Sequence, residues 1–241
     1  MLSAAEIRRT SREAGWLYLV MSVLAMFGYF YLNGRFIISG DPAATARNIL
    51  AHEQLYRLGI LSDLVGEVLF ILVVLALYRL FKDVDRKQAR AMVALVGTGI
   101  AAQFACFCLS VVPLMLLKGD AYLSVFTRPQ LEALSYASTS LQGKEGQLLT
   151  SLWGLWLFPF GTLAIKSGFL PKFLGALLII TGIAYVVTCA VGVGFPEYAD
   201  PVRKIALPLY FGEFIVVLWL ALVGARPRAV DKSPVAAPTP M

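Results

Sequence analysis

Three carboxylic acids lie inside apolar stretches of the 241-residue sequence, where ionisable side chains are rare. Asp63 and Glu67 are four residues apart, so on a helix they share one face with Gly59. Glu213 lies in a separate apolar stretch near the end of the chain. A charge at the centre of a bilayer costs at least ~2.5–3.5 kcal/mol on insertion scales. Such carboxylates could share protons, relay them or hold a cation, or they could join helices through structural hydrogen bonds.

The two glutamates are expected at similar depth in the membrane. Glu67 follows Arg57 by ten residues, and Glu213 follows Arg203 by the same number. At 1.5 Å per residue, each glutamate lies ~15 Å from an arginine that we expect at the membrane interface. Polar residues in the middle of other apolar stretches enlarge the cluster. The predicted ligand or ion site comprises Asp63, Glu67, Gln103, Thr181, Tyr185 and Glu213.

The elements that must hold these side chains are membrane helices. Apolar residues make up 59% of the chain and charged residues only 15%, which argues against an ordinary soluble domain and against a disordered chain. Each apolar stretch can cross ~30 Å of hydrocarbon as a helix, and none shows the alternation of a barrel strand. The six predicted membrane helices are Ala14–Leu32, Leu58–Tyr78, Ala91–Leu117, Gln147–Ile165, Phe173–Phe195 and Ile205–Ala225.

The predicted fold class is all-α: a polytopic six-transmembrane-helix bundle with two short interfacial helices in the outer connections. Asp41 and Pro42 supply an N-cap and a proline at the first helical position, which predicts a helix to about Ala51. Thr127–Gln130 has the pattern of a capping box, which predicts a second short helix over Arg128–Leu141.

Lysine and arginine counts set the expected orientation. Thirteen of the 21 basic residues lie on the side that holds both chain termini, against eight in the opposite, longer connections. Because cytoplasmic connections are the richer in Lys and Arg, both termini are predicted to be cytoplasmic. The domain organisation is then a cytoplasmic segment (1–13), a membrane domain (14–225) and a disordered Pro/Ala-rich cytoplasmic tail (226–241).

The net charge of +6 does not predict a nucleic-acid partner, because the basic residues lie in short runs at the ends of apolar stretches. The expected partners are the lipid bilayer, a small hydrophobic ligand or a cation, and a second copy of the chain in a homodimer. No metal site is predicted, because the single histidine, His52, has no cysteine near it in the sequence. No cofactor is predicted, and the phosphate-loop and nucleophile motifs of enzymes are absent.

Three blocks of the sequence are more specific than hydropathy alone. They are GDPAATARNIL at Gly40–Leu50, SGFLPKFLGALLIITGIAY at Ser167–Tyr185 and GEFIVVLWLALVGA at Gly212–Ala225. With them, the chain from about Arg12 to Gly224 resembles a bacterial membrane family known as domain of unknown function 4386. The resemblance implies a six-helix protein of the bacterial inner (cytoplasmic) membrane and places Asp63 and Glu213 on family positions. It implies no activity and no cofactor.

These observations leave three hypotheses for function. In the first, the bundle binds a hydrophobic small molecule, lipid or cation in a pocket at the membrane-embedded carboxylates; Trp153 and Trp156 could line that pocket or simply pack. In the second, the bundle is a structural or regulatory subunit that docks another membrane protein. In the third, it is an intramembrane enzyme that uses Asp63, Glu67 and Glu213.

Overall fold

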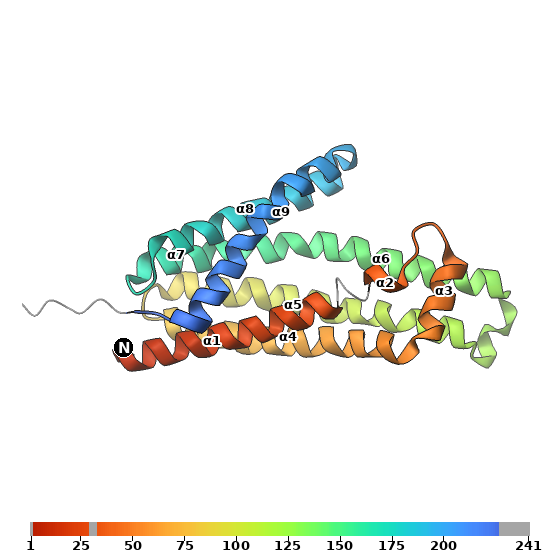
Figure 1. Cartoon of the computed structure of the whole chain (residues 1–241), viewed down its shortest axis with the longest axis horizontal. Coiled ribbons are helices and arrows are strands. Elements are labelled where there is room, and N and C mark those ends of the chain that lie inside the picture. The colour runs from red at the N-terminus through yellow and green to blue at the C-terminus, as the bar shows by residue number, and fades with distance from the viewer. Residues whose placement is uncertain (1, 29–32, 227–241) are drawn as a thin grey trace, which may run out of the picture.

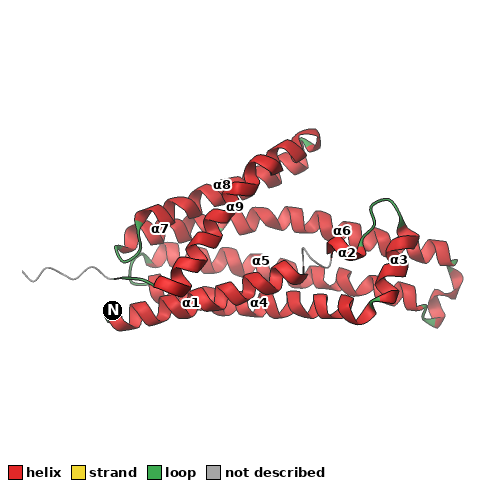
Figure 2. Cartoon of the chain, viewed as in Figure 1, coloured by secondary structure: helices red, strands yellow, loops and turns green. Residues whose placement is uncertain are grey.

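The computed structural model describes residues 2–28 and 33–226, and this part of the chain is helical with short connections and no strand (Figure 2). The long helices are α1 (Ala4–Ala25), α4 (Glu53–Phe81), α5 (Arg86–Lys118), α6 (Arg128–Leu155), α8 (Lys172–Gly194) and α9 (Ala199–Leu218). The shorter elements are α2 (Asn33–Phe36), α3 (Pro42–Ala51), η2 (Ala121–Val125), α7 (Leu157–Ser167), η3 (Pro196–Tyr198) and the π-helical turn η4 (Trp219–Val223). The predicted all-α class is confirmed.

Five helical stretches of the described chain are long and apolar enough to cross a membrane. They are Glu53–Phe81, Arg86–Lys118, Arg128–Ser167, Lys172–Gly194 and Pro196–Val223, and each overlaps one of the second to sixth predicted membrane helices. The protein is therefore an integral membrane protein built as a polytopic bundle.

The first predicted membrane helix, Ala14–Leu32, is described only in part. Helix α1 covers it as far as Ala25, Met26–Gly28 continue as a π-helical turn, and residues 29–32 lie outside the described residues. The count of six membrane helices stays a prediction.

Helices α1, α4, α5 and α6 run along the long axis of the molecule, and each packs on the next in that order (Figure 1). Helices α8 and α9 pack on each other, and α8 also packs on α6 and α7. In Figure 1 the two helices lean away from α6 toward the connection between the end of α8 and the start of α9. The start of α1 and the end of η4 lie at one end of the bundle, and α3 lies toward the other.

Aromatic stacking fills the half of the bundle near the start of α1. Trp156, at the junction of α6 and α7, stacks on Phe160 with ring centroids 5.3 Å apart. Phe81 at the end of α4 stacks on Phe169 at 5.6 Å. All but Phe169 are almost completely buried. Because lipid is as apolar as these side chains, close packing rather than removal from water stabilises this core.

The helix ends follow the signals in the sequence. Asp41 caps α3, as predicted, by accepting a hydrogen bond from the Ala44 N–H at 2.8 Å. Asp85 caps α5 by accepting from the backbone N–H of Gln88, and its other oxygen accepts from Lys166 Nζ at 2.8 Å. The Lys166 ammonium, together with this cap, holds the pKa of the Asp85 carboxyl below its usual range. The pair ties the start of α5 to the end of α7.

The second predicted interfacial helix is not a separate element, so that prediction was wrong. The helix begins at Arg128, and the Thr127 N–H donates to Gln130 Oε1 at 2.8 Å as the capping box requires. It then runs without interruption through Leu141 to Leu155, so α6 joins the predicted interfacial helix to the membrane helix that follows. Packing explains the continuity, since Ser135, Ser138 and Thr139 are buried and Ser138 Oγ donates to the Leu109 carbonyl of α5.

Candidate functional site

A cavity of about 290 Å³ lies among the long helices. Side chains from α1, α4, α5, α6, α8 and α9 line it, so it is a feature of the whole bundle. Five of the six predicted site residues lie on its wall: Asp63, Glu67, Gln103, Tyr185 and Glu213. The two glutamates predicted at similar depth thus line one cavity. Its volume is close to the lower end of the range for small-molecule sites.

Glu213 is held by two tyrosines from two other helices. The Tyr18 hydroxyl of α1 donates to Glu213 Oε1, and the Tyr185 hydroxyl of α8 donates to Oε2 at 3.1 Å. Tyr185 stacks on Tyr210 with centroids 4.5 Å apart, and the Tyr210 hydroxyl donates to Thr188 Oγ1 at 2.8 Å. Both oxygens of this carboxyl group are therefore occupied, and the arrangement joins α1, α8 and α9.

Asp63 and Glu67 form a second, differently built acidic pair on α4. Both side chains are half-buried, and neither makes a hydrogen bond or ion pair within the described residues. The Asp63 carboxyl group lies against Gly28, where any added Cβ atom would collide with it. Arg57 does not reach them, because its Nε bonds Glu53 at 2.8 Å. The two carboxyl groups therefore line the cavity without a hydrogen-bond or ion-pair partner among the described residues.

Aromatic rings make up much of the remaining wall. Phe70 meets Trp156 edge to face with centroids 5.4 Å apart, and Tyr18 lies 6.1 Å from the same indole. Phe107, Trp153 and Phe214 add further aromatic surface. Trp156 both packs in the core and lines the cavity, so the two roles left open for the tryptophans coexist. Such a wall offers an apolar body flat contact surfaces and offers a cation the faces of electron-rich rings.

Comparison with known proteins places this bundle in a family. Residues 14–224 match the family described as domain of unknown function, DUF4386. The chain belongs to the DUF4386 family. It is also similar to an uncharacterized protein of Archaeoglobus fulgidus, with 35% identity over 81 residues. That match covers 34% of this chain and 47% of the relative, so the chain spans about half the length of the relative it matches. No solved structure matches it.

The remaining predicted residues of this DUF4386 protein lie away from the cavity wall. Thr181 is fully buried, and its hydroxyl donates to the Leu209 carbonyl at 2.8 Å, which links α8 to α9 beside Gly212. Arg203 pairs with Asp200 at 2.7 Å near the start of α9. Within the described residues, no three His, Cys, Asp or Glu side chains are grouped closely enough to hold a metal ion.

Several side chains of the wall were not predicted from the sequence. Tyr18 and Ser22 come from α1, Tyr210 from α9 and Gln142 from α6, whose Nε2 donates to Ser110 Oγ at 2.6 Å. The available signal was the spacing of Tyr18 and Ser22, four residues apart inside an uncharged stretch, which puts two polar side chains on one helical face. The prediction was based on ionisable residues, which lie on α4 and α9.

Proposed function

We propose that this integral membrane protein binds a small amphipathic cation in the cavity of its bundle. The carrying observation is the pair of carboxyl groups, Asp63 and Glu67, that lack a partner among the described residues and lie on a wall rich in aromatic side chains. A cationic group would lie at these two acids, and the apolar body would lie against Phe70 and Trp156.

Charge and shape both support an organic cation over a neutral ligand. Two carboxylates held side by side in an apolar bundle are costly unless they share a proton or face a positive charge. Aromatic faces add attraction for an ammonium group once water is displaced. The cavity, at about 290 Å³, suits a molecule with one ring and a compact cationic group.

The cellular setting belongs to the same proposal. The excess of Lys and Arg on the side of the two termini supports a cytoplasmic membrane location with both termini inside. Membrane-embedded acids often mark ion and proton pathways. Because protonation of Asp63 or Glu67 would remove a negative charge from the site, it would release a bound cation.

The test uses purified protein in detergent and two probes of the same shape. Phenyltrimethylammonium carries the charge, and tert-butylbenzene is its neutral counterpart. Because Trp153 and Trp156 line the cavity, binding is measured through tryptophan fluorescence. We expect the ammonium probe to bind and the double variant Asp63→Asn, Glu67→Gln to bind it at least about tenfold more weakly, or about 1.4 kcal/mol. The control, Asp200→Asn, removes an exposed acid and should leave binding unchanged.

Equal binding of the two probes, unaltered in the double variant, would contradict a cation site and favour a pocket for neutral hydrophobic molecules. Absence of binding by both probes to the folded protein would overturn the proposal and leave the docking-subunit and intramembrane-enzyme hypotheses.

A further inference from the structure

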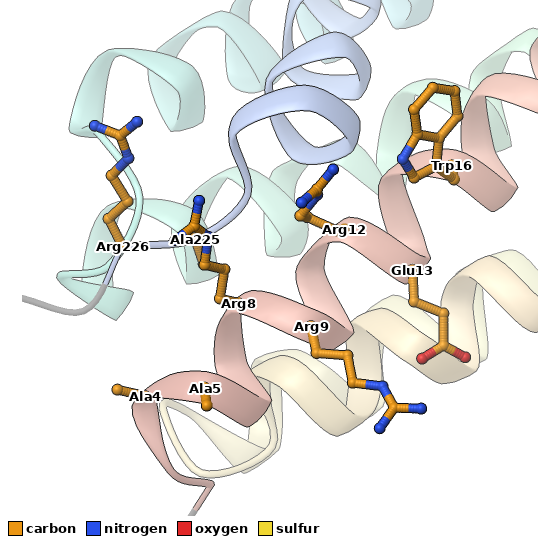
Figure 3. Close-up of a pocket in the computed structure, with 9 residues that line it drawn as sticks. All are labelled: Ala4, Ala5, Arg8, Arg9, Arg12, Glu13, Trp16, Ala225 and Arg226. Carbon is orange, nitrogen blue, oxygen red and sulfur yellow. The ribbon is translucent and has the colours of Figure 1, made fainter.

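A second hollow, separate from the central cavity, lies at the end of the bundle where α1 begins. Its volume is about 860 Å³, and it lies between the first turns of α1 and the residues that follow η4 (Figure 3). The charged and aromatic side chains that line it are Arg8, Arg9, Arg12, Glu13, Trp16 and Arg226. Four guanidinium groups and a single carboxylate make this groove strongly basic.

Two hydrogen bonds join α1 to the C-terminal wall of the groove, and a third anchors that wall to the connection between α7 and α8. The Ala225 N–H donates to Ser11 Oγ at 2.7 Å, and Arg12 Nε donates to the Ala221 carbonyl at 3.3 Å. The Arg226 N–H donates to the Phe169 carbonyl at 2.8 Å. Gly15 packs so closely on the backbone of Ala221 that an added Cβ atom would collide with it. The basic side chains are therefore carried by a rigid junction.

Two of the arginine side chains in the groove have no partner among the described residues. The side chains of Arg8 and Arg226 make no hydrogen bond or ion pair within residues 2–28 and 33–226. Elsewhere Lys166 and Lys118 each pair with an acid. In Figure 3, Arg8 and Arg12 point toward the C-terminal segment, whereas Arg9 and Glu13 point to the other side of α1. The groove thus has more arginine side chains than the one carboxylate of Glu13 can pair with, which suits a phosphate group.

One face of α1 continues from these arginines into the apolar part of the bundle. Arg8, Arg12, Trp16 and Val20 follow one another at intervals of four residues, and all are exposed. Trp16 is 47% exposed, Val20 49% and, one turn on, Val23 59%. From Trp16 to Phe27 the helix rises ~16 Å, about half of a ~30 Å hydrocarbon layer. Basic, then aromatic, then apolar is the order of headgroup, interface and acyl chain in one leaflet.

We propose that this groove is a binding site for an anionic phospholipid. The phosphate lies between Arg8, Arg12 and Arg226, Trp16 lies at the level of the glycerol ester groups, and the acyl chains lie along the exposed apolar face of α1. A lipid bound here would also fasten α1 to the segment that follows η4, because the phosphate contacts side chains from both. Its expected effect is thus stabilisation of the folded bundle by anionic lipid.

The test measures thermal unfolding of the full chain in detergent with added phosphatidylglycerol or phosphatidylcholine, and counts bound lipid by native mass spectrometry. The groove variant is Arg8→Gln, Arg226→Gln, which spares the Arg12–Ala221 hydrogen bond. The control, Arg86→Gln, Arg90→Gln, removes two exposed cations from the start of α5 and changes the net charge equally. We expect phosphatidylglycerol affinity to fall at least about tenfold in the groove variant and to stay within about twofold of the natural protein in the control.

A further arm adds inorganic phosphate in place of lipid, and we expect no stabilisation, because the acyl chains supply part of the contact. Stabilisation by phosphate equal to that by phosphatidylglycerol would overturn the lipid assignment in favour of a soluble anion. Equal losses in the groove and control variants would overturn the site, since general attraction between charges would then explain the binding. Retained affinity in the folded groove variant would overturn it as well.

Discussion

The Glu213 carboxyl group and its two tyrosine donors explain how one acid is accommodated inside an apolar bundle. Tyr18 and Tyr185 satisfy both oxygens, so the group needs no ligand to avoid an unpaired polar atom. Asp63 and Glu67 differ because no described side chain donates a hydrogen bond to either carboxyl group. The three acids thus fall into two sets: Glu213, which joins helices, and the pair Asp63 and Glu67, which line the cavity without a partner among the described residues. The function proposed for the cavity depends on the second set alone.

The variant Tyr18→Phe removes one donor from Glu213 and leaves the ring in place. We expect the free energy of unfolding to fall by about 0.6–1.7 kcal/mol, between the average and the maximum for hydrogen bonds between membrane helices. Tyr185→Phe should cost a similar amount. The double variant should lose more than the sum of the two, because it alone leaves the carboxyl group with neither donor. The measurement is reversible unfolding of the purified protein in mixed micelles.

The matched control for these variants is Tyr198→Phe, because this tyrosine is exposed at the start of α9. It should unfold like the natural protein. If the free energy of unfolding of Tyr18→Phe, Tyr185→Phe and the double variant is as little changed as that of this control, the hydrogen bonds to Glu213 do not stabilise the bundle.

At the scale of elements, glycines set how closely helices approach. A Cβ atom on Gly154 would lie 2.7 Å from the carbonyl oxygen of Gly182, and one on Gly161 would lie 2.7 Å from that of Gly175. The first pair brings α8 against α6, and the second brings it against α7. Gly154 and Gly161 are seven residues apart, about two helical turns, and so are Gly175 and Gly182. Small residues at matched turns are how membrane helices gain contact area without a hydrophobic driving force.

Alanine at Gly161 should therefore force α7 and α8 apart. We expect Gly161→Ala to destabilise the protein by about 1–3 kcal/mol, as overpacking of a well-fitted core does. Gly97 on α5 is the control, since an added Cβ atom there meets nothing within 4 Å. Gly97→Ala should be neutral, or more stable by up to ~1 kcal/mol from helix propensity. Unfolding midpoints in detergent decide between them, and equal midpoints would refute the close-contact argument.

Hydropathy and capping signals were enough to predict where most helices lie. The Asp41 cap of α3 and the start of α6 at Arg128 were both predicted, because these signals act within four residues. The continuity of α6 was not, because the polar stretch near Gln142 interrupts the apolar pattern while packing on α5 keeps it helical. Tyr18 was missed for a related reason: its role depends on Glu213, which is 195 residues away in the sequence. Spacing within one helix cannot reveal a partner on another.

At the scale of the whole molecule, both described ends of the helical region lie at the same end of the bundle (Figure 1). The Ser11–Ala225 hydrogen bond joins them, so the start of α1 and the segment after η4 must lie on the same side of the membrane. Helix α3 lies toward the opposite end. The Ser11–Ala225 end of the bundle therefore lies either inside or outside the cell. The count of basic residues favours the inside.

Single cysteines at the two ends of the bundle test this orientation in intact cells. The background replaces Cys106, Cys108 and Cys189 with alanine, so that only the introduced thiol reacts. Arg47→Cys on α3 is exposed and should react with a membrane-impermeant maleimide added outside. Lys87→Cys at the start of α5 is also exposed and should react only after the membrane is permeabilised. The reverse pattern would invert the bundle and place the arginine groove on the outer leaflet. Reaction at both positions before permeabilisation would be incompatible with a bundle whose two ends lie on opposite sides of a bilayer.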